Sequence, residues 1–216
     1  MISKSIIFKN FTKKKKISKI TKHNLRILLN NKSELIKSLG KNYKDSCDLK
    51  YIKKKIKKNE TLRLIGMGGS ILGSRAIYDF LKNKIKKKIY FIDNLISTND
   101  FSNKKKFLNL IVSKSGNTLE TITNINIHVK SKDTNIFITE NKKSYLYSLA
   151  INLKSEIVHH NNYIGGRYSV LSEVGMLPAA LMGLNPIKFR QLNNLIKNKR
   201  FFNSLLYNVE KILSLT

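Results

Sequence analysis

The chain contains few of the residues that mark special classes of small proteins. Cys47 is the only cysteine, and the 216 residues include two prolines and no tryptophan. A single cysteine excludes an intrachain disulfide and gives no sign of an oxidising compartment. The longest apolar stretch, 175–184, is too short to span a membrane, and the amino terminus has no apolar core of signal-peptide length. We therefore expect a cytoplasmic protein without a membrane segment.

Acidic residues are also scarce. Lys and Arg number 42 against 13 Asp and Glu, which gives a formal net charge of +29. Such an excess is typical of proteins that bind nucleic acids or anionic membranes. Here the excess is mostly lysine, spread over many segments and accompanied by abundant Asn and Ile, as a coding bias toward A and T would produce. A nucleic-acid partner is therefore the less favoured interpretation.

The hydrophobic pattern divides the chain into three segments. Residues 1–59 are basic and helical in pattern. From residue 60 strands alternate with helices, which predicts an α/β domain over 60–185, a parallel sheet of about five strands sandwiched by helices. Residues 186–216 are helical again. The expected strands are 62–65, 89–92, 108–112, 135–139 and 156–158, and the helices between them are 71–82, 100–106, 119–130 and 144–153.

The last expected helix, 204–216, continues to the final residue without a cap. Its apolar residues recur at helical spacing: Leu205, Leu206, Val209, Ile212 and Leu213. An apolar stripe of this kind needs a surface to cover it. We therefore expect the chain to be a fragment that leads to a missing carboxyl-terminal part.

A polar loop follows the third expected strand. Residues 113–118 read Ser-Lys-Ser-Gly-Asn-Thr and lie between the end of a strand and the start of a helix. Backbone N–H groups and the positive end of the helix dipole converge there, which suits a phosphate dianion. The hydroxyls of Ser113, Ser115 and Thr118 can donate further hydrogen bonds. The alternative is an ordinary polar loop between a strand and a helix.

A glycine-rich stretch, 66–73, follows the first expected strand and reads Gly-Met-Gly-Gly-Ser-Ile-Leu-Gly. Its spacing fits neither a dinucleotide fingerprint nor a P-loop. Glycines allow the backbone to approach a ligand, and Ser70 can cap the following helix. Tight packing of strand against helix is the alternative.

In the polar loop, Asn117 with Glu120 three residues later is typical of a capping box.

A third motif, Gly-Gly-Arg-Tyr-Ser at 165–169, follows the last expected strand. Arg167 stays charged at any working pH and suits stabilisation of an oxyanion, although a surface ion pair is the commoner role of an arginine. Ligands of parallel sheets bind beyond the carboxyl ends of the strands, and all three motifs fall on that edge. The four histidines show no metal-ligand spacing, so we interpret them as structural and expect no metal.

Together the three motifs resemble those of the phosphoglucose isomerase (glucose-6-phosphate isomerase) family, in its amino-terminal sugar-isomerase (SIS) domain. The family's G-G-S-x-x-G loop is similar to residues 68–73. Its phosphate loop, which begins S-K, is similar to 113–121, and its G-G-R-[FY]-S signature is similar to 165–169. Order and spacing agree over residues 60–185.

The resemblance implies isomerisation of glucose 6-phosphate and fructose 6-phosphate through a cis-enediolate, in glycolysis and gluconeogenesis. It implies no cofactor, and a homodimer for the complete protein. It also implies these site residues: Ser113, Ser115 and Thr118 on the sugar phosphate, Gly69, Ser70, Lys114 and Gly166 lining the pocket, and Arg167 on the enediolate.

The catalytic base is not assigned by the resemblance. In the family it is a glutamate in a Q-x-x-E-S-x-G-K segment beyond the third motif, and no stretch of this chain matches that segment. Glu173, where the family has a small residue, is the remaining candidate because it follows Arg167 closely. We therefore expect sugar-phosphate binding without isomerisation by these residues alone. A non-catalytic sugar-phosphate sensor is the alternative.

Overall fold

The computed structural model of the chain describes residues 17–55, 61–95 and 106–215. Residue contacts divide the chain into two compact units, Lys44–Phe189 and the pair Met1–Tyr43 with Arg190–Thr216. The larger unit contains the sheet and all three motifs. The helix expected over 100–106 falls, except for its last residue, outside the described residues.

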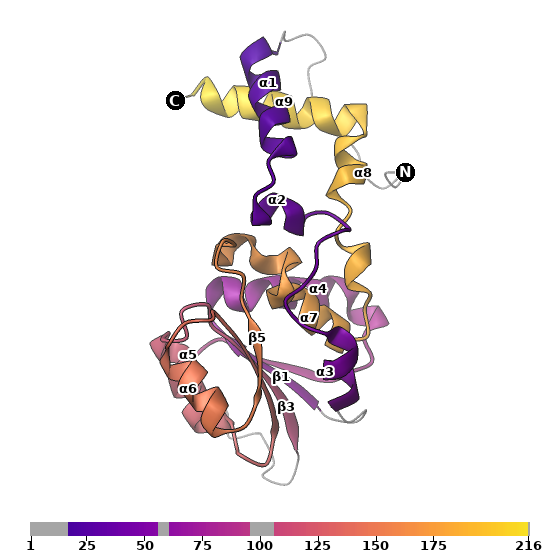
Figure 1. Cartoon of the computed structure of the whole chain (residues 1–216). Coiled ribbons are helices and arrows are strands. Elements are labelled where there is room, and N and C mark those ends of the chain that lie inside the picture. Colours follow the sequence, from indigo (N-terminus) through magenta and orange to yellow (C-terminus); the bar gives the residue numbers. More distant parts are fainter. Residues whose placement is uncertain (1–16, 56–60, 96–105, 216) are drawn as a thin grey trace. The chain divides into compact units, whose positions relative to one another are not determined.

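The larger unit is built on a parallel sheet of five strands in the order β2-β1-β3-β4-β5 (Figure 1). The strands are β1 Thr61–Gly66, β2 Ile89–Ile92, β3 Phe107–Val112, β4 Thr134–Thr139 and β5 Glu156–His159. All five expected strands are confirmed, each to within one residue at either end. Such strands can be predicted from the sequence because they are buried on both faces and therefore form continuous apolar runs.

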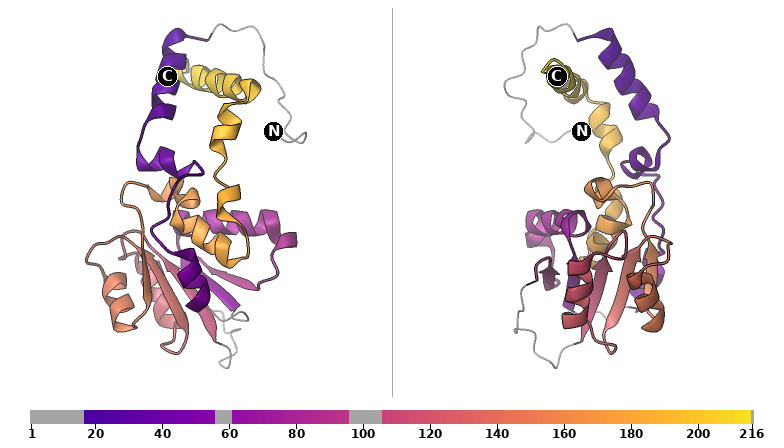
Figure 2. Two further views of the ribbon diagram at one scale, coloured as in Figure 1. Left: turned by 45° about the vertical axis from the view of Figure 1, so that its right-hand side comes forward. Right: turned by 90° about the vertical axis from the view of Figure 1, so that its left-hand side faces the viewer.

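Helices cover both faces of this sheet (Figure 2). One face carries α3 Leu49–Lys55, α4 Leu72–Leu81 and α7 Glu173–Leu181, and the other carries α5 Leu119–His128 and α6 Tyr145–Asn152. Short 3-10 turns complete the unit: η1 Gly68–Ser70, η2 Lys82–Lys84, η3 Gly166–Leu171 and η4 Pro186–Lys188. The expected α/β fold class is therefore confirmed. The helix α3, grouped by sequence with the amino-terminal segment, packs with the sheet through Ile52.

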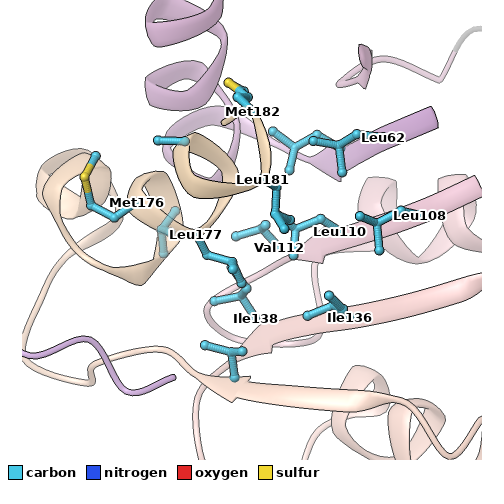
Figure 3. Close-up of a cluster of buried hydrophobic side chains, with 14 of the residues drawn as sticks. Leu62, Leu108, Leu110, Val112, Ile136, Ile138, Met176, Leu177, Leu181 and Met182 are labelled. Carbon is cyan, nitrogen blue, oxygen red and sulfur yellow. The ribbon is translucent and has the colours of Figure 1, made fainter. Parts of the chain in front are cut away.

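Alternation along the strands produces two hydrophobic cores. On one face Leu110 and Ile138 pack in one cluster with Leu177 of α7 (Figure 3). On the other face Ile111 and Phe137 belong to the cluster beneath α5 and α6. Each fully buried side chain of this size stabilises the fold by about 1.5–3 kcal/mol. The two cores hold the strands rigidly, so the strand ends from which the loops start have fixed positions.

A polar row crosses the second face within this apolar surrounding. Arg63, Asn109 and Asn135 are register partners on β1, β3 and β4, and all three are buried. The Asn109 amide donates to Asn135 Oδ1 at 2.7 Å, and the Arg63 guanidinium lies 3.8 Å from the centre of the Phe107 ring. A slip of one residue would turn these groups to the other face. The row therefore fixes the strand register and, with it, the alignment of the strand ends.

The helix α7 contains Pro178 in its interior. Proline has no N–H, so the carbonyl of Val174, four residues earlier, loses its helical partner. The Ser74 hydroxyl of α4 donates to that carbonyl at 3.4 Å, and both residues are buried. This hydrogen bond satisfies the carbonyl and ties α4 to α7.

The smaller unit contains α1 Lys19–Asn30, α2 Glu34–Ser38, α8 Leu192–Ile196 and α9 Lys199–Leu213. α1 contacts α9, with Leu25 and Leu206 buried. α9 begins five residues before the expected start at 204, because Asn198 accepts hydrogen bonds from the first helical N–H groups. Ile212 at the far end of α9 is 63% exposed. None of the helices in the described ranges is long and apolar enough to cross a membrane.

Candidate functional site

The three motifs meet at the carboxyl edge of the sheet. They lie beside the point where the connections that follow β1 and β3 leave toward opposite faces of the sheet. Gly66 at the end of β1 is the register partner of Val112 at the end of β3. After β1 the chain runs through α4 on one face, and after β3 it runs through α5 on the other. Diverging connections of this kind open a crevice at the strand ends, where ligands of parallel sheets bind.

The polar loop after β3 forms a compact turn at the amino end of α5. The hydroxyls of Ser113 and Thr118 lie 2.9 Å apart in a hydrogen bond, and Gly116 adopts a positive φ of 67°. Thr118 occupies the N-cap position, but its side chain makes no capping hydrogen bond to the helix. The first-turn N–H groups of α5 therefore remain available at the loop, together with the positive end of the helix dipole. Hydroxyls and N–H groups in this arrangement suit a phosphate.

Two expected caps are wrong. Asn117 does not cap α5, because its Oδ1 accepts a hydrogen bond from the N–H of Tyr145, the first residue of α6, at 2.9 Å. Glu120 lies in the first turn of α5, where its charge favours the helix dipole without a capping box. Ser70 does not cap α4 either, because it ends η1 and Ile71 takes the N-cap position. Within the described residues the Ser70 hydroxyl makes no hydrogen bond, so it is available to a ligand.

The glycines of the first motif pack its backbone against the end of β3 and against η3. A Cβ on Gly69 would lie 2.4 Å from the carbonyl oxygen of Gly166, and one on Gly66 would lie 2.9 Å from that of Val112. A Cβ on Gly73 would lie 2.7 Å from a methyl carbon of Val170. These glycines therefore serve tight packing, the alternative given above to approach to a ligand. Because Gly69 contacts Gly166, the backbones of the first and third motifs touch.

Arg167 is exposed, and its guanidinium makes no hydrogen bond or ion pair in the part of the chain that the structure describes. It borders a hollow of about 660 Å³ that is otherwise lined mainly by apolar side chains, among them Leu72 and Phe80 of α4. Gly69 and Gly166 also line this hollow, whereas the hydroxyl loop 113–118 does not. The hollow and the hydroxyl loop therefore lie on different parts of the surface.

The Lys114 ammonium is engaged by protein groups. Its Nζ donates to the carbonyl oxygens of Asn162 at 2.9 Å and Ile164 at 3.2 Å, and lies 3.3 Å from Glu140 Oε1. The family resemblance implies that this side chain lines the phosphate pocket, and that role stays a prediction. In the structure its ammonium ties the hydroxyl loop to the segment that follows β5.

Glu173 is fully buried at the start of α7. Its Oε1 accepts a hydrogen bond from the Asn161 N–H at 2.6 Å and lies 4.0 Å from His160 Nδ1. Burial lowers the pKa of His160 below its ordinary value, and the nearby Lys114 charge lowers it further, against the raising effect of the Asn161 carbonyl. We take this histidine as neutral, because burial outweighs a 4.0 Å approach to a carboxylate. A carboxylate enclosed in this way is not placed to take a proton from a sugar.

Two residues at the site, Thr139 and Glu140, were not found from the sequence. The Thr139 hydroxyl donates to the carbonyl of Lys114 at 3.3 Å. Glu140 pairs with Lys114, as described above. Thr139 and Glu140 lie at the end of β4, on the same edge as the motifs, which is the signal that could have indicated them. No cluster of His, Cys, Asp or Glu within the described ranges could hold a metal ion.

The model of the phosphoglucose isomerase family matches residues 30–203. The chain belongs to the phosphoglucose isomerase family. The glucose-6-phosphate isomerase of Acholeplasma laidlawii is 35% identical over 162 residues, which cover 66% of this chain and 38% of that protein. That of Staphylococcus aureus (strain Newman) is 34% identical over 154 residues, 61% of this chain and 35% of that protein. The chain thus spans well under half the length of these relatives.

Solved structures share the fold at lower identity. A hypothetical protein of Thermus thermophilus has a TM-score of 0.68 at 22% identity, covering 88% of this chain and 52% of its own. The tagatose-6-phosphate ketose/aldose isomerase of Escherichia coli has a TM-score of 0.55 at 17% identity, covering 73% and 47%. These similarities agree with the SIS-type parallel sheet expected for a phosphoglucose isomerase family member.

Proposed function

We propose that the carboxyl edge of the sheet binds the phosphate of glucose 6-phosphate and fructose 6-phosphate, and that the protein takes part in their interconversion. The observation that supports this most directly is the hydroxyl loop at the uncapped amino end of α5. Contact between Gly69 and Gly166 places the backbone that carries Arg167 against the loop of Ser70. Membership of the phosphoglucose isomerase family supports the choice of sugar phosphate.

In this proposal the phosphate is held by hydroxyls and backbone N–H groups. Ser113 and Thr118 turn their hydroxyls from each other to the phosphate oxygens, and Ser115 and Ser70 add two more donors. First-turn N–H groups of α5 complete the shell. Gly166, where an added Cβ would meet nothing within 4 Å, leaves open space for the sugar beside the backbone.

The isomerisation itself moves protons and no net electrons. A base takes the proton from C2 of the open-chain aldose, and the electron pair forms the cis-enediolate between C1 and C2. The Arg167 guanidinium stabilises the negative oxygen of that intermediate. Return of the proton to C1, with transfer of the hydroxyl proton from O2 to O1, gives the ketose.

The base is not a residue that the structure describes near Arg167. Glu173 is enclosed, Glu140 pairs with Lys114, and Asp93 forms a 2.5 Å ion pair with Arg75. We therefore propose that the base is a carboxylate from outside the described residues. A homodimer and a cytoplasmic location stay predictions for the complete protein.

Calorimetric titration of this chain tests the proposal. Glucose 6-phosphate and inorganic phosphate should both bind, whereas glucose should not. Ser113→Ala should weaken both phosphate ligands by about tenfold, the worth of one hydrogen bond to a charged group. Lys143→Ala, which removes an exposed charge near the same edge, is the control and should change little. Equal weakening in both variants would contradict the assigned loop.

A non-catalytic sugar-phosphate binder is the second candidate, because Glu173 is buried and Glu140 and Asp93 are paired with basic side chains. A coupled assay that follows glucose 6-phosphate formed from fructose 6-phosphate separates the two functions when the base is present. For these 216 residues alone we expect binding and no turnover. Turnover that disappears in Glu173→Gln would show that Glu173 is the base after all.

A further inference from the structure

We infer that Lys114 and Glu173 are positioning residues for Arg167. From two sides they hold the backbone segment 160–164, which leads directly into the Gly-Gly-Arg motif. Through Lys114 the placement of Arg167 is coupled to the hydroxyl loop. The chemistry assigned to Arg167 rests on the proposed function, but the contacts that carry the inference do not depend on it.

Lys114 holds the segment from the side of the hydroxyl loop. Its ammonium donates to the carbonyls of Asn162 and Ile164, at 2.9 and 3.2 Å, although these residues lie 48 and 50 positions later in the chain. Glu140 lies 3.3 Å from the same ammonium and balances its charge. A lysine that already binds three oxygens of the protein is a cross-link between loops and is poorly placed to bind a phosphate.

The backbone of Lys114 is fixed as firmly as its side chain. Its carbonyl accepts hydrogen bonds from the Glu140 N–H at 3.1 Å and the Thr139 hydroxyl at 3.3 Å. Lys114 lies between Ser113 and Ser115, the hydroxyl residues of the loop. Any shift of this loop on binding phosphate therefore moves the ammonium and, with it, the 160–164 segment.

Glu173 holds the same segment from the interior. Its carboxylate is fully buried and accepts from the Asn161 N–H at 2.6 Å. The His160 ring packs beside it, with Nδ1 2.9 Å from the Asn161 carbonyl and 4.0 Å from Glu173 Oε1. A buried carboxylate that accepts a short hydrogen bond from a backbone N–H is a strong local anchor.

The position of the 160–164 segment fixes that of the Arg167 backbone, because only Gly165 and Gly166 lie between them. Gly165 follows Ile164 directly, and the carbonyl of Gly166 accepts from the Ser169 hydroxyl at 2.8 Å. That carbonyl also lies against Gly69, where even one added carbon would be 2.4 Å away. With both ends held in this way, the guanidinium starts from a defined backbone position.

Hydrogen exchange on this chain measures the cross-link. The reporters are the amides of Asn161, Tyr163, Ile164 and Tyr168. The Asn161 amide donates to Glu173, and the other three donate within the segment or the turn that follows it. Lys114→Met should speed their exchange by about tenfold or more, because two hydrogen bonds to a charged donor are lost. Lys114→Arg should restore much of the protection. Lys142→Met, at an exposed lysine two residues from Glu140, is the control and should match the wild type.

Inorganic phosphate separates positioning from phosphate binding. Phosphate added to the wild type should slow exchange at the four reporter amides, and this response should be lost in Lys114→Met although phosphate still binds. The affinity for phosphate should fall by less than about threefold in Lys114→Met, whereas loss of a direct cationic ligand would cost tenfold or more. If Lys114→Met does not fold, Lys114→Gln serves for both measurements with the same expected results.

Two results would overturn the inference. One is unchanged exchange of the reporter amides in Lys114→Met, which would show that the cross-link holds nothing. The other is a phosphate affinity that falls tenfold or more with the phosphate response intact, which would make Lys114 a phosphate ligand. Failure of the wild type to bind glucose 6-phosphate would refute the proposed function alone, because the exchange rates would still report on the cross-link.

Discussion

A methyl group added at Gly69 should separate the two glycine motifs. In Gly69→Ala the new Cβ would lie 2.4 Å from the carbonyl oxygen and 2.6 Å from the carbonyl carbon of Gly166. Ordinary contact begins at 3.4 Å, so the two backbones must move apart by about 1 Å. The obstacle is backbone, which has no rotamer to change. Overpacking of this kind costs about 1–3 kcal/mol of folding free energy.

The same shift should be felt in function. Displacement of a positioned group by about 1 Å can reduce a rate by about 100-fold, and Arg167 follows the displaced carbonyl directly. Gly165→Ala is the matched control, because its Cβ would meet nothing closer than Tyr168 Cδ2 at 3.7 Å and its φ is −67°. Fewer unfolded conformations should make that control neutral or more stable by about 0.4–1 kcal/mol.

Urea denaturation followed by circular dichroism is the assay, since the chain has no tryptophan to report by fluorescence. The two alanine variants should shift the unfolding free energy in opposite directions or, at the least, differ by more than about 1 kcal/mol. A Gly69→Ala protein within about 0.5 kcal/mol of the wild type would refute the reasoning, and so would equal loss in both variants.

Three further predictions follow from particular contacts. Burial lowers the pKa of His160 in the fold, while the unfolded side chain keeps its ordinary pKa near 6.5. Stability should therefore fall as the pH decreases below about 6.5, by up to about 1.4 kcal/mol per pH unit for this group. His160→Asn should reduce the pH dependence of urea midpoints measured from pH 7.5 to 5, and the lowered pKa of buried His128 accounts for a part that remains. If the wild type and the variant follow the same profile, His160 is not the group. Ser74→Ala should cost about 1–3 kcal/mol in the same urea assay by leaving the Val174 carbonyl unpaired beside Pro178, whereas a loss below 0.5 kcal/mol would show that another group satisfies it. Exposed Ile212 on α9 predicts self-association, so Ile212→Lys should sediment closer to a monomer than the wild type, and identical profiles would contradict this.

The strands, and the strand that each motif follows, could be predicted from the sequence. Burial of a strand on both faces produces a continuous apolar run, which is easily recognised. Leu110 and Ile111 are both fully buried, one on each face, so the run is apolar without alternation. The common edge of the three motifs followed from the rule that parallel strands end on the same side. Family resemblance supplied the roles of single residues, which composition and spacing do not give.

Long-range polar contacts could not be predicted in the same way. Asn117 is well placed in sequence to cap its own helix, yet its side chain accepts from Tyr145, 28 residues later, because the two helix starts lie side by side at the sheet edge. The resemblance implies that Lys114 lines the phosphate pocket, but the sequence gives no sign that its ammonium donates to carbonyls of the 160–164 segment. Nothing in the spacing of Glu173 indicates that its carboxylate is buried. Whether a polar side chain bonds a partner nearby in sequence or a distant one depends on tertiary packing.

The central claim is that a sugar phosphate binds across the ends of β1 and β3. Amide chemical shifts of the ¹⁵N-labelled chain, recorded during titration with glucose 6-phosphate, test it most directly. We expect saturable shifts centred on Ser113–Thr118 and the first turn of α5, with smaller shifts at Gly69, Ser70 and Arg167, and none of these with glucose. Shifts confined to exposed lysines elsewhere on the surface, or no saturable shifts at these residues, would contradict it.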